Sequence, residues 1–165
     1  MKKTVILARS FARAAKDPLR RLEDAGIMVE IKKNLDPENE MVVSDLIGDA
    51  EGVLVGMDRV GEVVLSRCPN LKVVSKHRVG VDNIDLKAAQ KYGVVVANAP
   101  GTNSVSVAEM AFTLILTLAR QLPYFFEQVK KKDWGATRFG LELEGKTIGI
   151  VGFGRIGKTV GQFAN

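Results

Sequence analysis

The sequence has a single cysteine, Cys68, and few aromatic residues, which make up 6% of its 165 residues. One cysteine excludes an internal disulfide, so we expect a reducing, cytoplasmic setting. The chain is not strongly charged, because 24 basic residues face 19 acidic ones for a formal net charge of +5. No aromatic residues interleave with the basic groups, as they do on nucleic-acid stacking surfaces, and we expect no nucleic-acid partner.

The sequence also lacks a long apolar run. The longest uncharged apolar stretch covers residues 110–119, which is too short to span a bilayer as a helix. The apolar run near the start covers only residues 5–8 before Arg9, too short for the core of a signal peptide. We therefore expect a soluble protein with no membrane partner.

Short β-branched and apolar runs alternate with amphipathic segments in the first hundred residues. The expected strands cover residues 4–8, 27–31, 52–56, 71–75 and 94–98. Helix starts are expected at Asp17-Pro18 and Asp36-Pro37, because Asp caps a helix and Pro suits its first turn. Strands separated by helices pair in parallel, and strands apolar on both faces suit a sheet covered on both sides. The sequence predicts an α/β fold, with a flavodoxin-like doubly wound parallel sheet over residues 1–98.

The pattern changes after residue 98. Residues 103–122 predict one long helix, which is apolar nearly all round from residue 110 to 118. Such a helix must be buried in a core or at a subunit interface, so we expect a homodimer. A second helix over residues 123–131 and a closing strand over residues 147–151 are expected to follow.

Glycines after the closing strand fit two nucleotide-binding patterns. Gly152, Gly154 and Gly157 match G-x-G-x-x-G, in which the first glycine permits a tight turn, the second lets the backbone approach a pyrophosphate and the third allows close packing. The same segment matches G-x-x-x-x-G-K-[ST], in which Lys158 would reach phosphates and Thr159 would hold magnesium. In the dinucleotide interpretation the helix begins before Lys158, so these two residues are ordinary helix residues. The local pattern alone leaves both interpretations open.

A longer string of residues resembles one enzyme family. The segment SKHRVGVDNIDLKAAQKYGVVVANAPGTNSVSVAE, residues 75–109, resembles a stretch of the D-isomer-specific 2-hydroxyacid dehydrogenases, particularly the phosphoglycerate dehydrogenase-like branch. LARQLP, Trp134 and LEGKTIGIVGFGRIGK continue the resemblance in family order. It implies an NAD-dependent oxidoreductase acting on the CH-OH group of a D-2-hydroxy acid. It also implies a substrate-binding domain over residues 1–98 and the truncated start of a Rossmann NAD-binding domain over residues 99–165.

The resemblance implies substrate-binding residues. The loop at Val79 and Gly80 would offer backbone amides to the substrate carboxylate, Lys76 matches a position that is often basic, and Asn103 matches a residue near the substrate and the hinge. Arg78 stands where the family often has a small residue, so it would crowd or recharge the loop. Each also has an ordinary explanation: Gly80 as a turn glycine, Lys76 as a solvated strand-end lysine and Asn103 as a helix N-cap.

The resemblance favours the dinucleotide interpretation and implies how the cofactor is held. The pyrophosphate of NAD would lie against Gly152, Gly154 and Gly157, with backbone contacts from Arg155 and Ile156. NADP stays open as an alternative, because the residue that holds the adenosine ribose would follow the segment present here.

The resemblance places the family's catalytic Arg, Glu and His beyond the position that matches Asn165. None of the three is therefore expected in this chain, and the only histidine, His77, does not match the catalytic one. We expect the chain to be the N-terminal half of a dehydrogenase and to be inactive alone.

Two other function classes remain open. A receiver-like signalling module needs clustered acids after its first strand to hold magnesium, but ILARSFAR has none there and Asp58 stands alone after the third strand. We predict no metal site. A non-catalytic partner that oligomerises through the long apolar helix is compatible with the family assignment.

We expect the purified 165-residue chain not to oxidise NADH with glyoxylate, hydroxypyruvate, pyruvate or phosphohydroxypyruvate. Hydride transfer to a 2-oxo acid needs a cation on the carbonyl and a held proton donor, and the resemblance places both outside this chain. The assay follows NADH absorbance against a blank without protein. Turnover above the blank would contradict the expectation.

Overall fold

The computed structural model describes residues 2–8, 10–11, 16–135 and 137–165 and divides the chain into two units, Met1–Pro100 and Gly101–Asn165. The boundary that the sequence predicted after residue 98 lies close to this division. The substrate-binding and cofactor-binding roles given to the two parts remain predictions.

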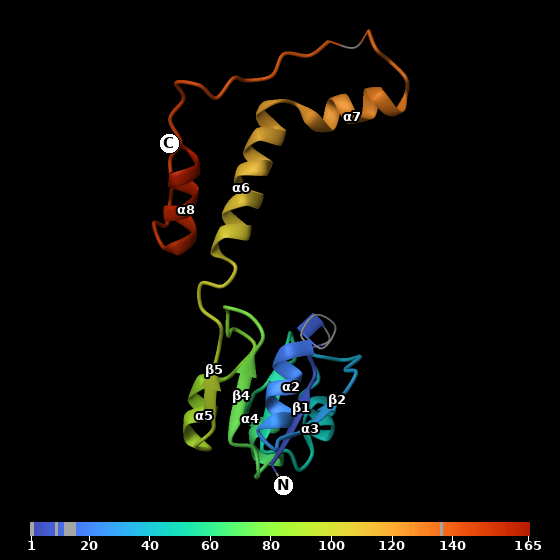
Figure 1. Ribbon diagram of the computed structural model, residues 1–165, viewed down its shortest axis with the longest axis vertical. Helices are drawn as coiled ribbons and strands as arrows, with labels where there is room; N and C mark the ends of the chain where they lie inside the picture. The colour runs from blue at the N-terminus through green and yellow to red at the C-terminus, as the bar shows by residue number, and fades with distance from the viewer. Residues whose placement is uncertain (1, 9, 12–15, 136) are drawn as a thin grey trace. The chain divides into compact units, whose positions relative to one another are not determined.

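The first unit is built on a parallel sheet of five strands in the order β2-β1-β3-β4-β5 (Figure 1). The strands are β1 (Lys3–Ile6), β2 (Met28–Ile31), β3 (Gly52–Val55), β4 (Val73–Lys76) and β5 (Val95–Ala97). This is the strand order of flavodoxin-like doubly wound sheets. The predicted fold class of this part is confirmed.

Helices connect successive strands, as the alternation of apolar runs and amphipathic segments predicted. They are α2 (Lys16–Asp24), α3 (Glu40–Ile47), α4 (Glu62–Arg67) and α5 (Leu86–Lys91). The start expected at Asp17-Pro18 lies inside α2, which already includes Lys16. Asp85 caps α5, since its carboxylate accepts hydrogen bonds from the backbone N–H groups of Lys87 at 3.0 Å and Ala88 at 2.9 Å.

The expected start of α3 at Asp36-Pro37 is wrong. Asp36 and Asn39 close a turn instead, with the Asn39 N–H 3.3 Å from the Asp36 carbonyl oxygen. The helix begins at Glu40 because the Asn39 side chain accepts the Met41 N–H at 3.1 Å and so supplies the N-cap.

The core lies where one face of the sheet meets the helices. Residues in register on neighbouring strands, Val5, Val53, Val74 and Val96, form a row of valines across the sheet. The first three are at most 1% exposed, and Val96 packs against the same cluster. Parallel strands place side chains of matched register on one face, so this row gives the helices a continuous apolar surface.

The other face of the sheet is covered only in part. Val73 and Val95 are paired in register on β4 and β5, and they are 36% and 64% exposed. α2 contacts β2, at the opposite edge of the sheet (Figure 1). Among the residues of this unit that the structure describes, the expected cover of both faces is therefore incomplete.

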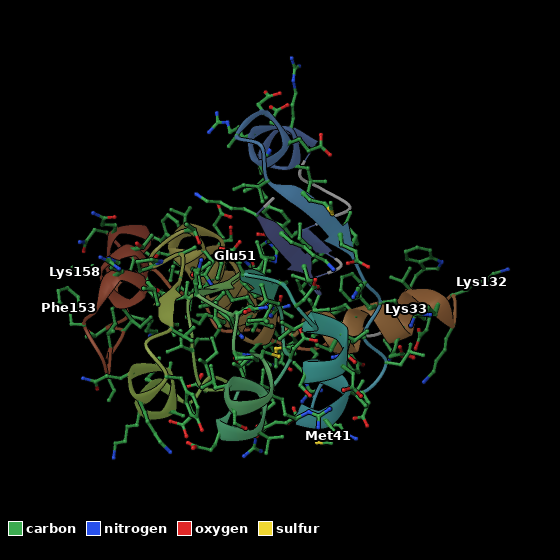
Figure 2. The ribbon with its side chains drawn as sticks, turned by 90° about the horizontal axis from the view of Figure 1, so that it is seen from below. Lys33, Met41, Glu51, Lys132, Phe153 and Lys158 are labelled. Carbon is green, nitrogen blue, oxygen red and sulfur yellow. The ribbon has the colours of Figure 1, made fainter. Side chains whose placement is uncertain are left out.

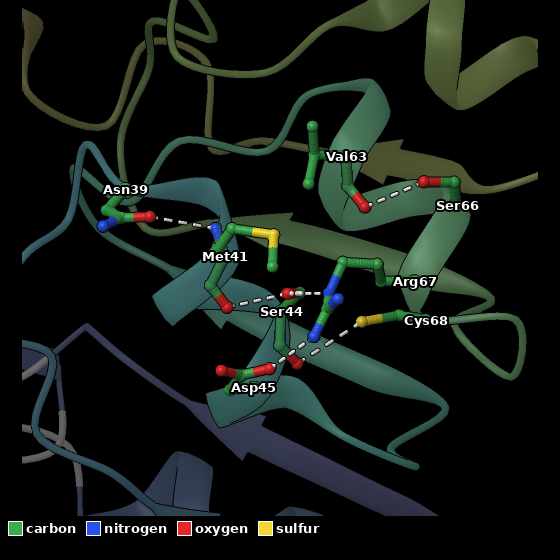
Figure 3. Close-up of polar contacts among 8 residues, drawn as sticks. All are labelled: Asn39, Met41, Ser44, Asp45, Val63, Ser66, Arg67 and Cys68. Atoms are coloured by element: carbon green, nitrogen blue, oxygen red, sulfur yellow. Dashed lines mark hydrogen bonds and ion pairs between the residues drawn. The ribbon is translucent and has the colours of Figure 1, made fainter.

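Polar contacts tie α3 to the end of α4 (Figure 3). The Arg67 guanidinium donates to the Ser44 hydroxyl at 2.8 Å and to the Asp45 carboxylate at 2.7 Å. Beside it, the buried Cys68 thiol lies 3.6 Å from the Ser44 carbonyl oxygen. Burial raises the pKa of the Cys68 thiol, because the thiolate would be poorly solvated there.

The start of α4 is capped by a side chain from another helix. One Glu40 carboxylate oxygen accepts the N–H groups of Val63 at 3.1 Å and Val64 at 3.4 Å, and the other lies 3.2 Å from the Arg59 Nε. A Cβ on Gly61 would come within 2.5 Å of this carboxylate. Glycine at that position therefore leaves the space that the cap occupies.

The second unit contains α6 (Ser104–Ala119), α7 (Leu122–Lys130) and α8 (Arg155–Phe163). α6 packs against α8, with the Phe112 and Phe163 rings edge to face at 6.2 Å between centroids. Among the described residues, no single helix is long and apolar enough to cross a membrane, and α6 and α7 reach that length and composition only as a pair bent by 67°.

The strand expected over residues 147–151 is not formed. These residues pair with no described segment, and Val151 is fully exposed. A strand is defined by hydrogen bonds to a neighbour, so apolar β-branched sequence alone does not produce one.

Replacing Glu40 with alanine should lower the free energy of unfolding of the first unit by about 1–2 kcal/mol, the usual cost of losing a helix cap. Labelling of the Cys68 thiol during urea unfolding measures this unit alone, because Cys68 is the only cysteine and is buried there. Glu38→Ala, at an exposed turn residue, is the matched control and should change stability by less than about 0.5 kcal/mol. Equal effects of the two substitutions would show that Glu40 does not stabilise α4.

Candidate functional site

The loop that follows β4 lies at the carboxyl edge of the sheet and is fixed at its far end. Val60 and Ile84 form an isolated parallel bridge. The Val60 N–H donates to the Asn83 carbonyl oxygen at 2.9 Å, and the Asp85 N–H donates to the Val60 carbonyl oxygen at 2.8 Å. The loop therefore spans a short distance between the end of β4 and this bridge.

Hydrogen bonds fix the direction in which the loop's peptide groups point. The Asn98 side chain donates to the Val79 carbonyl oxygen at 2.7 Å, and the Ala99 N–H donates to the Arg78 carbonyl oxygen at 3.3 Å. In the part of the chain that the structure describes, the N–H groups of Val79 and Gly80 have no hydrogen-bond acceptor. Successive free N–H groups form a site suited to an anion.

Gly80 is accommodated by close approach and not by an unusual backbone angle. Its φ lies outside the left-handed region, and a Cβ there would come within 2.9 Å of an Asp82 carboxylate oxygen. The explanation of Gly80 as an ordinary turn glycine therefore does not rest on a positive φ. A larger side chain would displace the Asp82 carboxylate and narrow the approach to the two N–H groups.

Lys76, the last residue of β4, is buried with only 4% exposed. Its ammonium donates to the Gly56 carbonyl oxygen at 2.5 Å and to the Asn83 side-chain oxygen. Burial lowers the pKa of Lys76, and the positive charge of Arg78 lowers it further, while Asp58 raises it. The solvated-lysine explanation is wrong, and contact with a substrate would require Lys76 to exchange these partners.

Sequence reasoning missed the asparagines that complete this arrangement. The Asn83 amide donates to the Asp58 carbonyl oxygen at 2.5 Å. The buried Asp58 carboxylate accepts the Asn34 amide at 2.7 Å and the Gly56 N–H at 2.9 Å. Each asparagine follows a predicted strand or lies in the loop after one, which was the available signal. The Asp58 carboxylate is therefore hydrogen-bonded within the protein and has a structural role.

His77 faces the loop after β1. Its Nδ1 lies 3.3 Å from the Ser10 hydroxyl, and its ring meets that of Phe11 edge to face at 5.2 Å. Nothing in these contacts gives the ring a carboxylate partner of the kind that holds a proton donor.

Asn103 occupies the N-cap position of α6, as one interpretation of the sequence expected. Its side chain makes no capping hydrogen bond within the described residues. Capping therefore does not account for the choice of asparagine, and its predicted role near the substrate stays a prediction.

The three glycines of the second unit have distinct geometries. Gly152 has a φ of +97°, which only glycine adopts readily, at the turn itself. A Cβ on Gly154 would meet nothing within 4 Å, whereas one on Gly157 would lie 2.2 Å from the Gly152 carbonyl oxygen. These are the turn, the open approach and the close contact that the dinucleotide pattern requires.

The helix start decides between the two nucleotide interpretations. α8 begins at Arg155, and the Lys158 N–H already donates to the Gly154 carbonyl oxygen at 2.9 Å. The Thr159 hydroxyl donates back to the Arg155 carbonyl oxygen at 3.0 Å. Lys158, on α8, and Phe153, just before it, are both exposed (Figure 2). Lys158 and Thr159 are ordinary helix residues, so the geometry favours a dinucleotide loop. The described residues contain no group of three or more His, Cys, Asp or Glu arranged for a metal ion.

Comparison with known sequences gives one consistent family. The sequence profile of the D-isomer specific 2-hydroxyacid dehydrogenase catalytic domain matches residues 5–156. D-3-phosphoglycerate dehydrogenase from Homo sapiens is 41% identical over 141 residues, and the enzyme of that name from Bacillus subtilis is 39% identical over 150 residues. These matches cover 84% and 90% of the chain but only 26% and 28% of the relatives. The chain thus spans little more than a quarter of their length.

Solved structures give the same result for the fold. The TT0316 protein from Thermus thermophilus superposes with a TM-score of 0.82 at 28% identity, over 98% of this chain and 52% of that one. D-lactate dehydrogenase from Aquifex aeolicus, solved as a complex with NAD and lactic acid, gives a TM-score of 0.78 at 28% identity, over 99% and 48%.

Proposed function

The chain belongs to the D-isomer specific 2-hydroxyacid dehydrogenase family, and from this membership we propose that it forms part of an NAD-dependent oxidoreductase. The reaction is hydride transfer between a D-2-hydroxy acid and the corresponding 2-oxo acid. The first unit contributes the substrate-binding part, and the second contributes the phosphate-binding loop for the cofactor.

The free N–H groups of Val79 and Gly80 are the observation that carries this proposal. They hold the substrate carboxylate, because two adjacent donors without protein acceptors match the oxygens of a carboxylate. The Asn98 bond to the Val79 carbonyl oxygen keeps the peptide from rotating and so preorganises the donors. Lys76 contributes by holding the start of the loop, with Asn83 as its partner.

The second unit fits a dinucleotide. The open space beside Gly154 admits the pyrophosphate, and the backbone N–H groups of Arg155 and Ile156 lie at the start of α8, where a helix attracts negative charge. Gly157 allows the helix to pack on the turn at Gly152. NAD supplies the hydride acceptor or donor when bound, and NADP is not excluded as its replacement.

The acid–base chemistry is proposed to lie outside these residues. Hydride transfer needs a proton donor held by a carboxylate and a cation on the substrate carbonyl. His77 has a serine and a phenylalanine beside it instead. The family's Arg, Glu and His therefore remain the proposed catalytic groups, and Asn103 is proposed to approach the substrate from the start of α6.

We also propose a cytoplasmic homodimer. α6 exposes a series of large apolar side chains, among them Met110 at 60%, Leu114 at 54% and Leu118 at 67%. Apolar surface of this kind favours association when a partner removes it from water. A second copy of α6 offers the same surface and is the simplest partner for a symmetric dimer.

Gly80→Val should weaken binding of pyruvate or hydroxypyruvate by at least roughly tenfold, because the new side chain narrows access to two charge-assisted hydrogen bonds. Titration of the isotope-labelled chain by NMR reports this directly through the Val79 and Gly80 amide signals. Gly135→Val is the control, since its Cβ would meet only Asp133 at 3.7 Å. If neither amide of the unmodified chain responds to a 2-oxo acid, the proposed substrate site is wrong.

Charged substitutions on α6 should reduce self-association. Met110→Glu combined with Leu118→Glu should raise the dimer dissociation constant at least roughly tenfold, since exposed apolar area would be replaced by carboxylates that resist burial. Light scattering over a concentration series measures the constant. Lys87→Glu, an exposed residue of α5, should leave it unchanged, and an unmodified chain that stays monomeric would argue against the dimer.

A further inference from the structure

A cavity opens at the carboxyl edge of the sheet in the first unit. It has a volume of about 460 Å³ and is lined by residues that follow β1, β2, β3 and β4, among them Ser10, Asn34, Met57 and Arg78. β2 and β3 lie on opposite sides of β1, so the carboxyl ends of β1 and β3 flank the point where the strand order reverses. Ligands of doubly wound sheets bind in the crevice at such a point.

Arg78 is the cation of this cavity that is free to bind a ligand. Within the described part of the chain, no carboxylate forms an ion pair with its guanidinium and no side-chain hydrogen bond engages it. The residue is exposed and follows directly on β4 and His77. A guanidinium offers a planar set of donors that suits a carboxylate or a phosphate group.

The other charged groups near the cavity are already bonded. The Asp58 carboxylate, the acidic group among the described lining residues, accepts from Asn34 and Gly56 through its two oxygens. The Lys76 ammonium is buried close enough for the Asp58 charge to raise its pKa, so the two charges partly offset each other. The exposed Asp82 carboxylate lies toward Gly80. The cavity therefore presents Arg78 as its accessible charge. The Asp58 carboxylate already accepts hydrogen bonds through both oxygens and does not compete with a ligand anion for Arg78.

Arg78 is also the immediate neighbour of the two free N–H groups. The Cα atoms of Arg78 and Gly80 are at most about 7 Å apart, because only two residues of chain separate them. One small molecule can therefore contact the Gly80 amide at one end and the Arg78 guanidinium at the other. A ligand whose carboxylate rests on Val79 and Gly80 can thus extend a second acidic group into the cavity. A ligand that ends in a methyl group would leave the guanidinium without a counter-ion.

We propose that Arg78 determines substrate specificity by selecting 2-oxo acids that carry a second anionic group at the far end. The inference rests on the proposed function, because it takes the Val79 and Gly80 amides as the site of the first carboxylate. The second group is a carboxylate or a phosphate, which share the chemistry that a guanidinium recognises.

The test compares matched pairs of acids by NMR titration of the 165-residue chain at low ionic strength. 2-Oxoglutarate and 2-oxopentanoate differ in the second carboxylate alone, and phosphohydroxypyruvate and hydroxypyruvate differ in the phosphate. In at least one pair, the acid with the second anionic group should bind roughly tenfold more tightly, as expected for one exposed charge-assisted contact. The pair that shows the larger difference identifies the favoured group, and added salt should reduce that difference.

Variants of Arg78 then test whether this residue causes the preference for a second anionic group. Arg78→Ala should abolish the discrimination within the pairs, and Arg78→Lys should retain part of it because an ammonium lacks the guanidinium's paired donors. Lys87→Ala, which removes an exposed cation from α5, should have no effect. Arg78 is exposed and unpaired among the described residues, so these variants should unfold at the same urea concentration as the unmodified chain.

Each outcome separates the two proposals. Discrimination that is lost in Arg78→Ala supports the inference. Equal binding within both pairs, or discrimination that survives Arg78→Ala, overturns it and leaves the proposed function in place. If no acid of either pair shifts the Val79 and Gly80 signals, the proposed function fails, and the specificity role fails with it.

Discussion

A positive charge removed from water at the end of β4 constrains the whole carboxyl edge of the sheet. Lys76 is 4% exposed, and an ammonium in such a place must have hydrogen-bond acceptors or lose its proton. The Gly56 carbonyl oxygen and the Asn83 side chain supply them. Because Gly56 follows β3 and Asn83 lies in the loop after β4, this one charge ties two connections together.

The remaining contacts of this edge extend that tie. The Asn83 amide also donates to the Asp58 carbonyl oxygen, and the Asp58 carboxylate accepts a hydrogen bond from Asn34, which follows β2. The Val60–Ile84 bridge then closes the loop from the other side. With both ends of the loop fixed, the Asn98 bond to the Val79 carbonyl oxygen orients the peptide that carries the Gly80 N–H. The Ala99 bond to the Arg78 carbonyl oxygen orients the peptide that carries the Val79 N–H. The free N–H groups therefore result from bonds made elsewhere.

The fold could be predicted from sequence wherever local pattern and tertiary packing agree. Apolar runs alternating with amphipathic segments predicted the five parallel strands, and the glycine spacing predicted the turn at Gly152 and the contact at Gly157. The hydrogen bond between Lys76 and Asn83 could not be predicted, because a lysine at a strand end and an asparagine in a loop are usually solvated. Their pairing depends on which strands become neighbours. The strand expected over residues 147–151 failed for the same reason, since pairing is a property of two segments and the sequence pattern describes one.

The anion sites proposed for the two units both consist of backbone N–H groups without acceptors, but the groups are exposed in different ways. In the second unit the donors are the N–H groups at the start of α8, which a helix leaves without acceptors by its own geometry. In the first unit they are loop N–H groups, and side-chain bonds from Asn98 and Lys76 must hold the loop that presents them. A helix terminus keeps its donors whatever the surrounding side chains are, whereas the loop loses its orientation if its ties are removed. Changes of side chain around the loop after β4 can therefore alter the orientation of its N–H groups more readily than changes of side chain around the start of α8 can.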